Sequence, residues 1–227
     1  GWKVIDAAGR VVAPGFMNIH SHADFHLPIP EHAQLYERLL YQGITTNIGG
    51  QCGFSFFPFR PERRKELDDY QGSLLYRDIE PQWSDCRQYF GFLEGRMLFN
   101  YAQLVGHGTL RVNAAGFAER LSQEQMFEMT RMLEESLDAG CFGLSSGLMY
   151  MPGTFADTAE LVALARVTRR HPRTLYASHL RGYSATFIEA IQEIIQVGRE
   201  ADIPVQVSHL GPFGVKNGYK IAQAIEL

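Results

Sequence analysis

The stretch VVAPGFMNIHSHAD, residues 11–24, joins an apolar run to His20 and His22, which are separated by a single residue. Such a run bounded by turn residues is typical of a β-strand. Side chains two positions apart on a strand point to the same face, so both imidazoles can approach one metal ion. Two hydrogen-bonded polar residues at a strand end would give the same pattern. The stretch alone leaves both interpretations open.

Short apolar runs alternate with longer amphipathic stretches along the rest of the chain. This order is typical of βα units built on a parallel sheet. A barrel of such units closes at eight strands, over about 250 residues. We therefore predict an α/β fold, an incomplete TIM-like (β/α)8 barrel of the metallo-dependent hydrolase type with about six βα units; an open doubly wound sheet is the alternative. The predicted strands lie near residues 15–20, 44–49, 100–105, 141–145, 174–178 and 204–208.

Capping residues mark the starts of two predicted helices. Ser122 with Gln125, and Asp157 with Glu160, have the spacing of a capping box, and each precedes residues with helical periodicity. The region 56–93 shows neither helical nor strand periodicity. We expect it to be a long, partly helical excursion, and loops of this length tend to be functional or mobile.

The bulk composition indicates an ordinary soluble globular protein. The chain has 227 residues, 45% of them hydrophobic, and a formal net charge of −4 without a basic stripe, so nucleic acid is not an expected partner. No apolar run is long enough to span a membrane and no secretory signal is visible, so we expect a cytoplasmic protein without a membrane partner. The chain starts without Met and ends in an uncapped helical pattern. We expect a fragment that lacks both chain ends.

Ligand-type residues follow several of the predicted strands. His20 and His22 follow the first, Cys52 the second, His179 the fifth and His209 the sixth. The carboxyl ends of parallel barrel strands meet at one rim, where active sites lie. Imidazole and thiolate together favour zinc over magnesium or calcium. The sequence thus predicts a zinc site, although Cys52 could instead be a small buried residue.

Two further residues are candidates for substrate binding. Tyr150, in LSSGLMYMPG, is placed to reach into a central pocket, and Arg181 could bind a substrate carboxylate with two hydrogen bonds. A tyrosine that packs a loop and an arginine at the surface are the alternatives. His107, in LVGHGTLR, could line the mouth of the barrel or stabilise a loop.

Six segments, taken in order, resemble the N-acyl-D-amino-acid deacylases (D-aminoacylases) of the amidohydrolase superfamily. That branch has a cysteine at the second strand where other branches have a modified lysine on the fourth, and here the fourth strand has no lysine. The resemblance implies a small β-sandwich beside the barrel, with residues 1–14 ending its N-terminal part and residues 15–227 forming a truncated catalytic barrel. The six segments are HSH after VVAPGFMN, GGQCGFS, LVGHGTLR, AGCFGLSSGLMYMPG, ASHLRG and PVQVSHLG.

The resemblance also implies a division of the metal ligands. Cys52, His179 and His209 would hold a tightly bound zinc ion, and His20 and His22 would serve a second, weaker site. It further implies that a tyrosine at the position of Tyr150 contacts the substrate.

The activity implied is zinc-dependent hydrolysis of the amide bond of small N-acyl-D-amino acids, releasing a carboxylate and a D-amino acid. The family's general base is an aspartate at the end of the eighth strand, so it is expected beyond residue 227 and no catalytic residue is expected in this chain. Gly211 stands where many D-aminoacylases have a lysine, and Lys216 is the nearest replacement. A cyclic-amide or dipeptide hydrolase, or a non-catalytic fragment, are the alternatives. The oligomeric state is not predicted.

Overall fold

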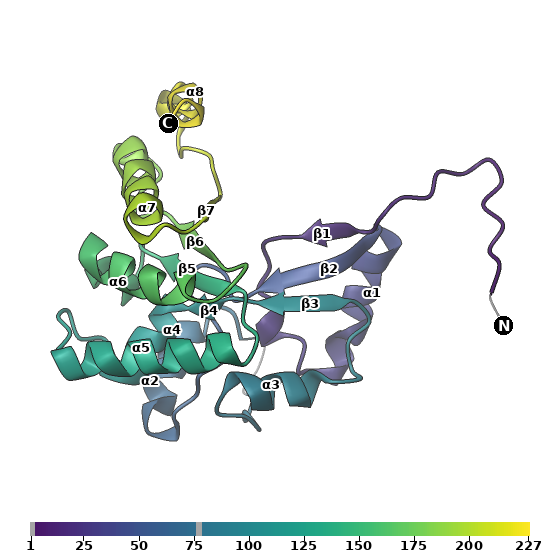
Figure 1. Ribbon diagram of the computed structural model, residues 1–227, viewed down its shortest axis with the longest axis horizontal. Coiled ribbons are helices and arrows are strands. Elements are labelled where there is room, and N and C mark those ends of the chain that lie inside the picture. The colour runs from purple at the N-terminus through teal and green to yellow at the C-terminus, as the bar shows by residue number, and fades with distance from the viewer. Residues whose placement is uncertain (1–2, 76–78) are drawn as a thin grey trace.

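The computed structural model describes residues 3–75 and 79–227, except for the side chains of residues 33–35. Its strands are all parallel and follow one another in chain order across two sheets (Figure 1). The first sheet contains β1 (Phe16–Asn18), β2 (Ile44–Gly49) and β3 (Asn100–Gln103). The second contains β4 (Val105–Gly106), β5 (Gly143–Gly147), β6 (Leu175–His179) and β7 (Val205–Ser208). This arrangement confirms the prediction of an α/β fold with a partial TIM-like barrel.

The predicted third strand, residues 100–105, is divided into β3 and β4 in the structure, which corrects the prediction of one continuous strand. Pairing between β2 and β3 ends at Gly49 and Gln103, because the chain turns away at Gly50 with a φ of 73°. Pairing with β5 then begins at Val105. The strand changes partner because its first neighbour leaves the sheet to form the loop that carries Cys52.

Four helices lie side by side along the outside of the second sheet (Figure 1). They are α4 (His107–Ala115), α5 (Gln123–Asp138), α6 (Thr158–Arg169) and α7 (Phe187–Ala201). The capping box of Ser122 and Gln125 is present at α5, and Asp157 caps α6 by accepting from the backbone N–H of Glu160. Helix α1 (Ala33–Tyr41) precedes β2, and α8 (Lys220–Ile225) packs against α7.

The excursion after β2 is partly helical, as expected. It contains α2 (Arg64–Gln71) and α3 (Cys86–Leu93), and five of its aromatic residues are buried: Phe56, Phe57, Tyr70, Trp83 and Tyr89. The indole of Trp83 donates a 2.7 Å hydrogen bond to the carbonyl of Phe56, which anchors the irregular backbone. Short 3-10 turns complete the chain at Ala23–Phe25, Pro30–His32, Pro61–Arg63, Gly153–Phe155 and Val215–Asn217.

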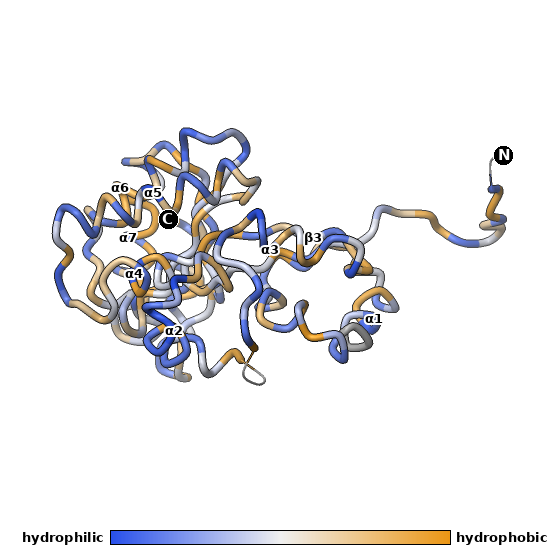
Figure 2. Tube along the Cα trace, turned by 90° about the horizontal axis from the view of Figure 1, so that it is seen from below, coloured by the Kyte–Doolittle hydropathy of each residue, from blue (hydrophilic) through white to orange (hydrophobic). Residues whose placement is uncertain are grey.

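Residues 3–14 form no helix or strand and extend away from the rest of the chain (Figure 2). The assignment of residues 1–14 to a β-sandwich stays a prediction, and residues 1 and 2 lie outside the described residues. Among the helices of the described ranges, none is long and apolar enough to cross a bilayer.

Candidate metal centre

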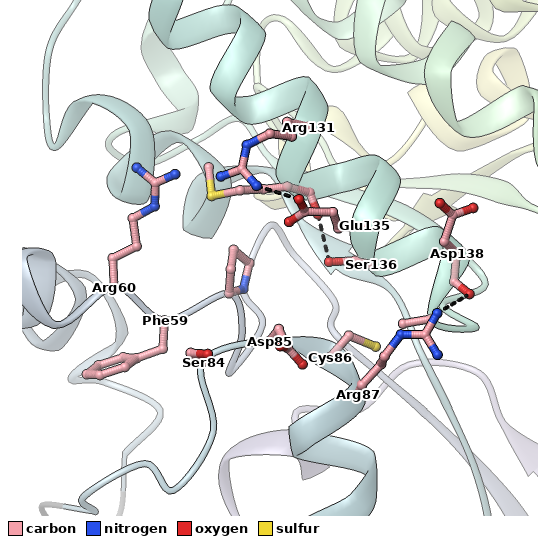
Figure 3. Close-up of a pocket in the computed structure, with 13 residues that line it drawn as sticks. Phe59, Arg60, Ser84, Asp85, Cys86, Arg87, Arg131, Glu135, Ser136 and Asp138 are labelled. Atoms are coloured by element: carbon pink, nitrogen blue, oxygen red, sulfur yellow. Dashed lines mark hydrogen bonds and ion pairs between the residues drawn. The ribbon is translucent and has the colours of Figure 1, made fainter.

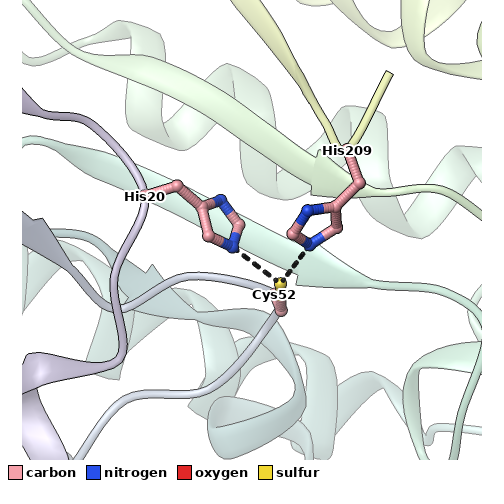
Figure 4. A group of neighbouring side chains, drawn as sticks. All are labelled: His20, Cys52 and His209. Carbon is pink, nitrogen blue, oxygen red and sulfur yellow. Dashed lines mark hydrogen bonds between the residues drawn. The ribbon is translucent and has the colours of Figure 1, made fainter. Parts of the chain in front are cut away.

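Three ligand-type side chains converge at the carboxyl ends of the strands (Figure 4). His20 follows β1, Cys52 follows β2 and His209 follows β7. The Cys52 Sγ lies 3.4 Å from Nε2 of His20 and 3.5 Å from Nε2 of His209, and the three donor atoms lie within 4.8 Å of one another. Zinc bonds of about 2.3 Å to sulfur and about 2.05 Å to nitrogen, at a tetrahedral angle, separate the two donors by about 3.5 Å. The spacing therefore fits a zinc ion.

His22 and His179 flank this group of three. The ring of His22 lies 5.7 Å from that of His20, and the ring of His179 lies 5.1 Å from that of His209, measured between centroids. The Nδ1 atoms of His22 and His179 are buried without a hydrogen-bond partner among the described residues. The same is true of Nδ1 of His107, so this feature alone does not identify a ligand. The rings of His22 and His179 thus lie next to the group of three, and metal ligation by these two histidines stays a prediction.

Burial sets the protonation of these groups. It lowers the pKa of His20, His22 and His179 to about 4, helped by repulsion from neighbouring histidines. The rings are therefore neutral near pH 7, the state in which imidazole binds a metal. Burial also raises the pKa of the Cys52 thiol to about 12. This thiol keeps its proton unless a cation stabilises the thiolate.

The loop that carries Cys52 has a left-handed backbone. The φ angles are 73° at Gly50, 56° at Cys52 and 79° at Gly53. A cysteine in this region is uncommon and needs support from its surroundings. Here the hydroxyl of Tyr150 donates to the carbonyl of Cys52, and that of Tyr70 donates to the carbonyl of Gly53 at 2.9 Å. Two tyrosines, one from α2 and one from the loop after β5, therefore hold the turn.

Tyr150 lies at the site, as the sequence predicted. Its ring stacks on Phe54 at 5.2 Å and lies 5.4 Å edge-on from the ring of His179. Its hydroxyl is engaged with the backbone of Cys52, so contact with a substrate stays a prediction. Phe54 also stacks on Tyr70 at 4.5 Å, which completes a row of three aromatic rings beside the candidate ligands His22 and His179.

The guanidinium of Arg181 forms its hydrogen bonds with residues other than the five predicted ligands. Its guanidinium forms two 2.9 Å bonds with the carboxylate of Glu193 in α7 and donates to the carbonyls of Thr154 and Ala156 at 3.1 and 2.8 Å. A substrate carboxylate would have to replace these bonds. The contacts favour the structural alternative, and substrate binding by Arg181 stays a prediction. Lys216 is exposed in the turn Val215–Asn217.

His107 is fully buried, and its Nε2 lies 2.7 Å from the carboxylate of Glu160, which Arg111 also binds at 2.9 Å. This supports a stabilising role for His107 at the start of α4. Sequence reasoning missed Tyr70, because it lies in the excursion without a recognisable pattern. It also assigned no role to Asp24, which stands two residues after His22. The Asp24 carboxylate is fully buried and accepts a 3.3 Å bond from Gln103.

The chain is similar to known proteins along almost its whole length. The profile of the amidohydrolase family matches residues 3–226. The N-acyl-D-glutamate deacylase of Alcaligenes xylosoxydans xylosoxydans is 38% identical over 207 residues, which make up 90% of this chain and 41% of that protein.

Two solved structures share the fold. One is the N-acyl-D-glutamate deacylase from Bordetella bronchiseptica, complexed with zinc and a phosphonate inhibitor that mimics the tetrahedral intermediate. It has a TM-score of 0.80 and 32% sequence identity, and the match covers 97% of this chain and 46% of that one. A D-aminoacylase studied for its binuclear metal centre has a TM-score of 0.82 and 29% identity over 98% and 46%. The chain therefore spans less than half the length of the relatives it matches. With a family profile that covers residues 3–226, the chain belongs to the amidohydrolase family, as its resemblance to D-aminoacylases indicated.

Proposed function

We propose that this chain supplies the metal-binding part of a zinc-dependent hydrolase that cleaves the amide bond of N-acyl-D-amino acids, releasing a carboxylate and a D-amino acid. The observation that carries the proposal is the convergence of Cys52 with His20 and His209 at the carboxyl ends of three parallel strands. The deacylases named above, one of them bound to zinc, support the same chemistry.

Cys52 is central to the proposed site because its sulfur lies against one histidine from each pair. It contacts His20 of the N-terminal pair and His209 of the C-terminal pair. Following the division that the resemblance to D-aminoacylases implies, we propose that Cys52, His179 and His209 hold the tighter zinc ion and that His20 and His22 serve the weaker position. The 3.4 Å contact between His20 and Cys52 supports two adjacent positions. Bound zinc would polarise the amide carbonyl and lower the pKa of bound water toward about 7.

The residues of this chain prepare the site for that chemistry. His20, His22 and His179 are neutral near pH 7, so metal binding does not have to displace protons from these three rings. Cys52 must lose its proton when the metal binds. Tyr150 places ring surface beside His179, and Phe54 stacks on Tyr150 and lies against His22, so these rings would limit access of water. The general base is proposed to be an aspartate outside residues 1–227, since no carboxylate of the described residues joins the cluster.

The setting of the protein is part of the proposal. Its three cysteines are free thiols, which agrees with a reducing cytoplasmic location. The net charge of −4 agrees with a small-molecule substrate and no nucleic acid partner.

Metal content and activity of the full-length protein test the function. The wild type should contain zinc and release acetate from N-acetyl-D-amino acids but not from the L-enantiomers. Replacing Cys52 by Ala should remove the tighter zinc and lower kcat/KM by at least about 100-fold. Cys86→Ala is the matched control, because Cys86 is buried but outside the metal centre. A Cys52→Ala variant with wild-type zinc and activity would overturn the proposal, as would a preference for hydantoins, dihydroorotate or dipeptides.

A further inference from the structure

Two cysteines outside the metal centre form a close pair. The Sγ atoms of Cys86 and Cys141 lie 3.2 Å apart although the residues are 55 positions apart in sequence. Both side chains are buried, and both are free thiols. Cys86 is the first residue of α3, and Cys141 lies just before β5. A disulfide requires the sulfur atoms to approach to about 2.0 Å, so a small side-chain movement would join them.

One of the two cysteines, Cys86, lines a cavity of about 450 Å³ between the excursion and α5. The residue is only 1% exposed, so the cavity wall must open locally before a disulfide reaches the sulfur. Figure 3 shows Cys86 in the cavity wall between Asp85 and Arg87. Cys141 does not line this cavity. The lining carries both signs of charge, with Arg60, Arg87 and Arg131 beside Asp85, Glu135 and Asp138. Mixed charges of this kind suit a small peptide disulfide such as glutathione disulfide, which has both ammonium and carboxylate groups.

We propose that Cys86 and Cys141 are a redox-active dithiol, which small-molecule disulfides of the glutathione type oxidise to an intramolecular disulfide. Cys86 reacts first, since it lines the cavity and Cys141 does not. Cys141 is the resolving residue. Burial raises the pKa of its thiol well above the ordinary value, which agrees with its acting second.

The reaction has two exchange steps. In the first, the Cys86 thiolate attacks one sulfur of glutathione disulfide, the S–S bond of that molecule breaks, and one glutathione leaves and takes up a proton. In the second, Cys141 loses its proton and attacks Sγ of Cys86, and the mixed disulfide breaks to release the second glutathione. The two cysteines are oxidised together, and one glutathione disulfide is reduced to two thiols.

The disulfide would connect the excursion to a strand that supports the loop carrying Cys52. The hydroxyl oxygen of Ser145 in β5 accepts a 3.0 Å bond from the backbone N–H of Gly53, the residue after Cys52. Oxidation would therefore join α3 to the start of β5, close in sequence to the residue that braces the Cys52 turn. A higher melting temperature is expected for the oxidised protein.

Peptide mapping of the full-length, zinc-loaded protein tests the proposal. The protein is equilibrated in glutathione buffers of stepped potential, quenched in acid and alkylated. Mass spectrometry should find Cys86 linked to Cys141 under oxidising buffers and Cys52 alkylated as a free thiol. The melting temperature should rise on oxidation of the wild type and stay constant in the double variant Cys86→Ala and Cys141→Ala.

Single variants test the order of reaction. Cys141→Ala should stop at one glutathione bound to Cys86, and Cys86→Ala should leave Cys141 without an adduct. Alkylation of both wild-type cysteines at every potential would overturn the proposal. A glutathione adduct on Cys141 in the Cys86→Ala variant would overturn the order. Because the peptide map of the wild type decides the first point, the test does not depend on the variants folding.

Discussion

The hydroxyl of Tyr70 donates a 2.9 Å hydrogen bond to the carbonyl oxygen of Gly53, the residue that follows the proposed zinc ligand Cys52. Tyr70 belongs to α2, in the excursion after β2, and contributes no ligand atom itself. Together with the bond from Tyr150 to the carbonyl of Cys52, it holds a left-handed turn in place. The excursion therefore supports the candidate metal centre from outside the barrel strands.

Replacing Tyr70 by Phe should weaken zinc binding while keeping the ring stack. The carbonyl of Gly53 keeps a 3.2 Å bond from the backbone N–H of Thr109, so the change removes one of its two hydrogen bonds, at a cost of about 0.5–1.5 kcal/mol. Outer partners of metal ligands typically change affinity by about 10–100-fold, and we expect the lower end of that range. Zinc competition against a chelator measures the effect. Tyr41→Phe is the control because Tyr41 is 89% exposed. Equal zinc affinity in Tyr70→Phe and wild type would contradict the role given to Tyr70.

Gly147→Ala should disturb the same turn from β5. An added Cβ would lie 2.3 Å from the carbonyl oxygen of Cys52 and 2.1 Å from the hydroxyl of Tyr150, so one of them must move. Overpacking of this kind costs about 1–3 kcal/mol of unfolding free energy. The denaturant concentration at the midpoint of unfolding and the zinc content should both fall. Gly91→Ala in α3 meets nothing within 4 Å and should be neutral or slightly stabilising. Similar behaviour of the two variants would rule out the close packing described for Gly147.

Glu160 should make stability depend on acid pH. Burial alone would raise its pKa, but hydrogen bonds and charge from His107 and Arg111 outweigh burial and lower it to about 2. The folded-state value lies below the unfolded value of 4.5, so the stabilisation is present above pH 4.5 and is lost as the pH falls toward 2. The difference corresponds to roughly 3 kcal/mol.

Melting temperatures of the metal-free protein, measured between pH 2 and about 7, check this expectation. The range ends near about pH 7 because carboxyl groups are normally fully ionised there. Glu160→Gln should be clearly less stable than wild type at the upper end, and the gap should close as the pH falls below 4.5. The exposed Glu124→Gln should follow the wild type throughout. A gap that does not change with pH would show that Glu160 acts through packing and not through its charge.

Metal stoichiometry should separate the two proposed zinc positions. His209→Ala removes a nitrogen 3.5 Å from the Cys52 sulfur and should lose the tighter ion. His22→Ala should keep that ion and lose only the weaker one. Elemental analysis after dialysis against a chelator of intermediate strength distinguishes these outcomes. If His22→Ala lost all zinc and His209→Ala kept one ion, the assignment of the tighter and weaker positions would be reversed.

The order and type of the barrel elements could be predicted from the sequence. The predicted strand 44–49 coincides with β2, and the other strands agree to within a few residues, except for the division of 100–105. Hydrophobic periodicity records which side of a local segment is buried, so it carries this information without long-range contacts. The division at Leu104 depends on the turn at Gly50, more than fifty residues earlier, and no local pattern contains it.

Sequence alone determined the βα order and the presence of histidines and a cysteine at strand ends, because both follow from local residue pattern. Only the tertiary structure decided which atoms meet. It placed Cys52 between His20 and His209, although Cys52 and His209 are 157 residues apart. It also bound Arg181 to Glu193. It brought Tyr70 to the loop that carries Cys52, and Cys86 to Cys141. Such contacts depend on how distant segments pack and on the few backbone angles that turn the chain between them. That packing is a property of the whole fold and not of any one segment.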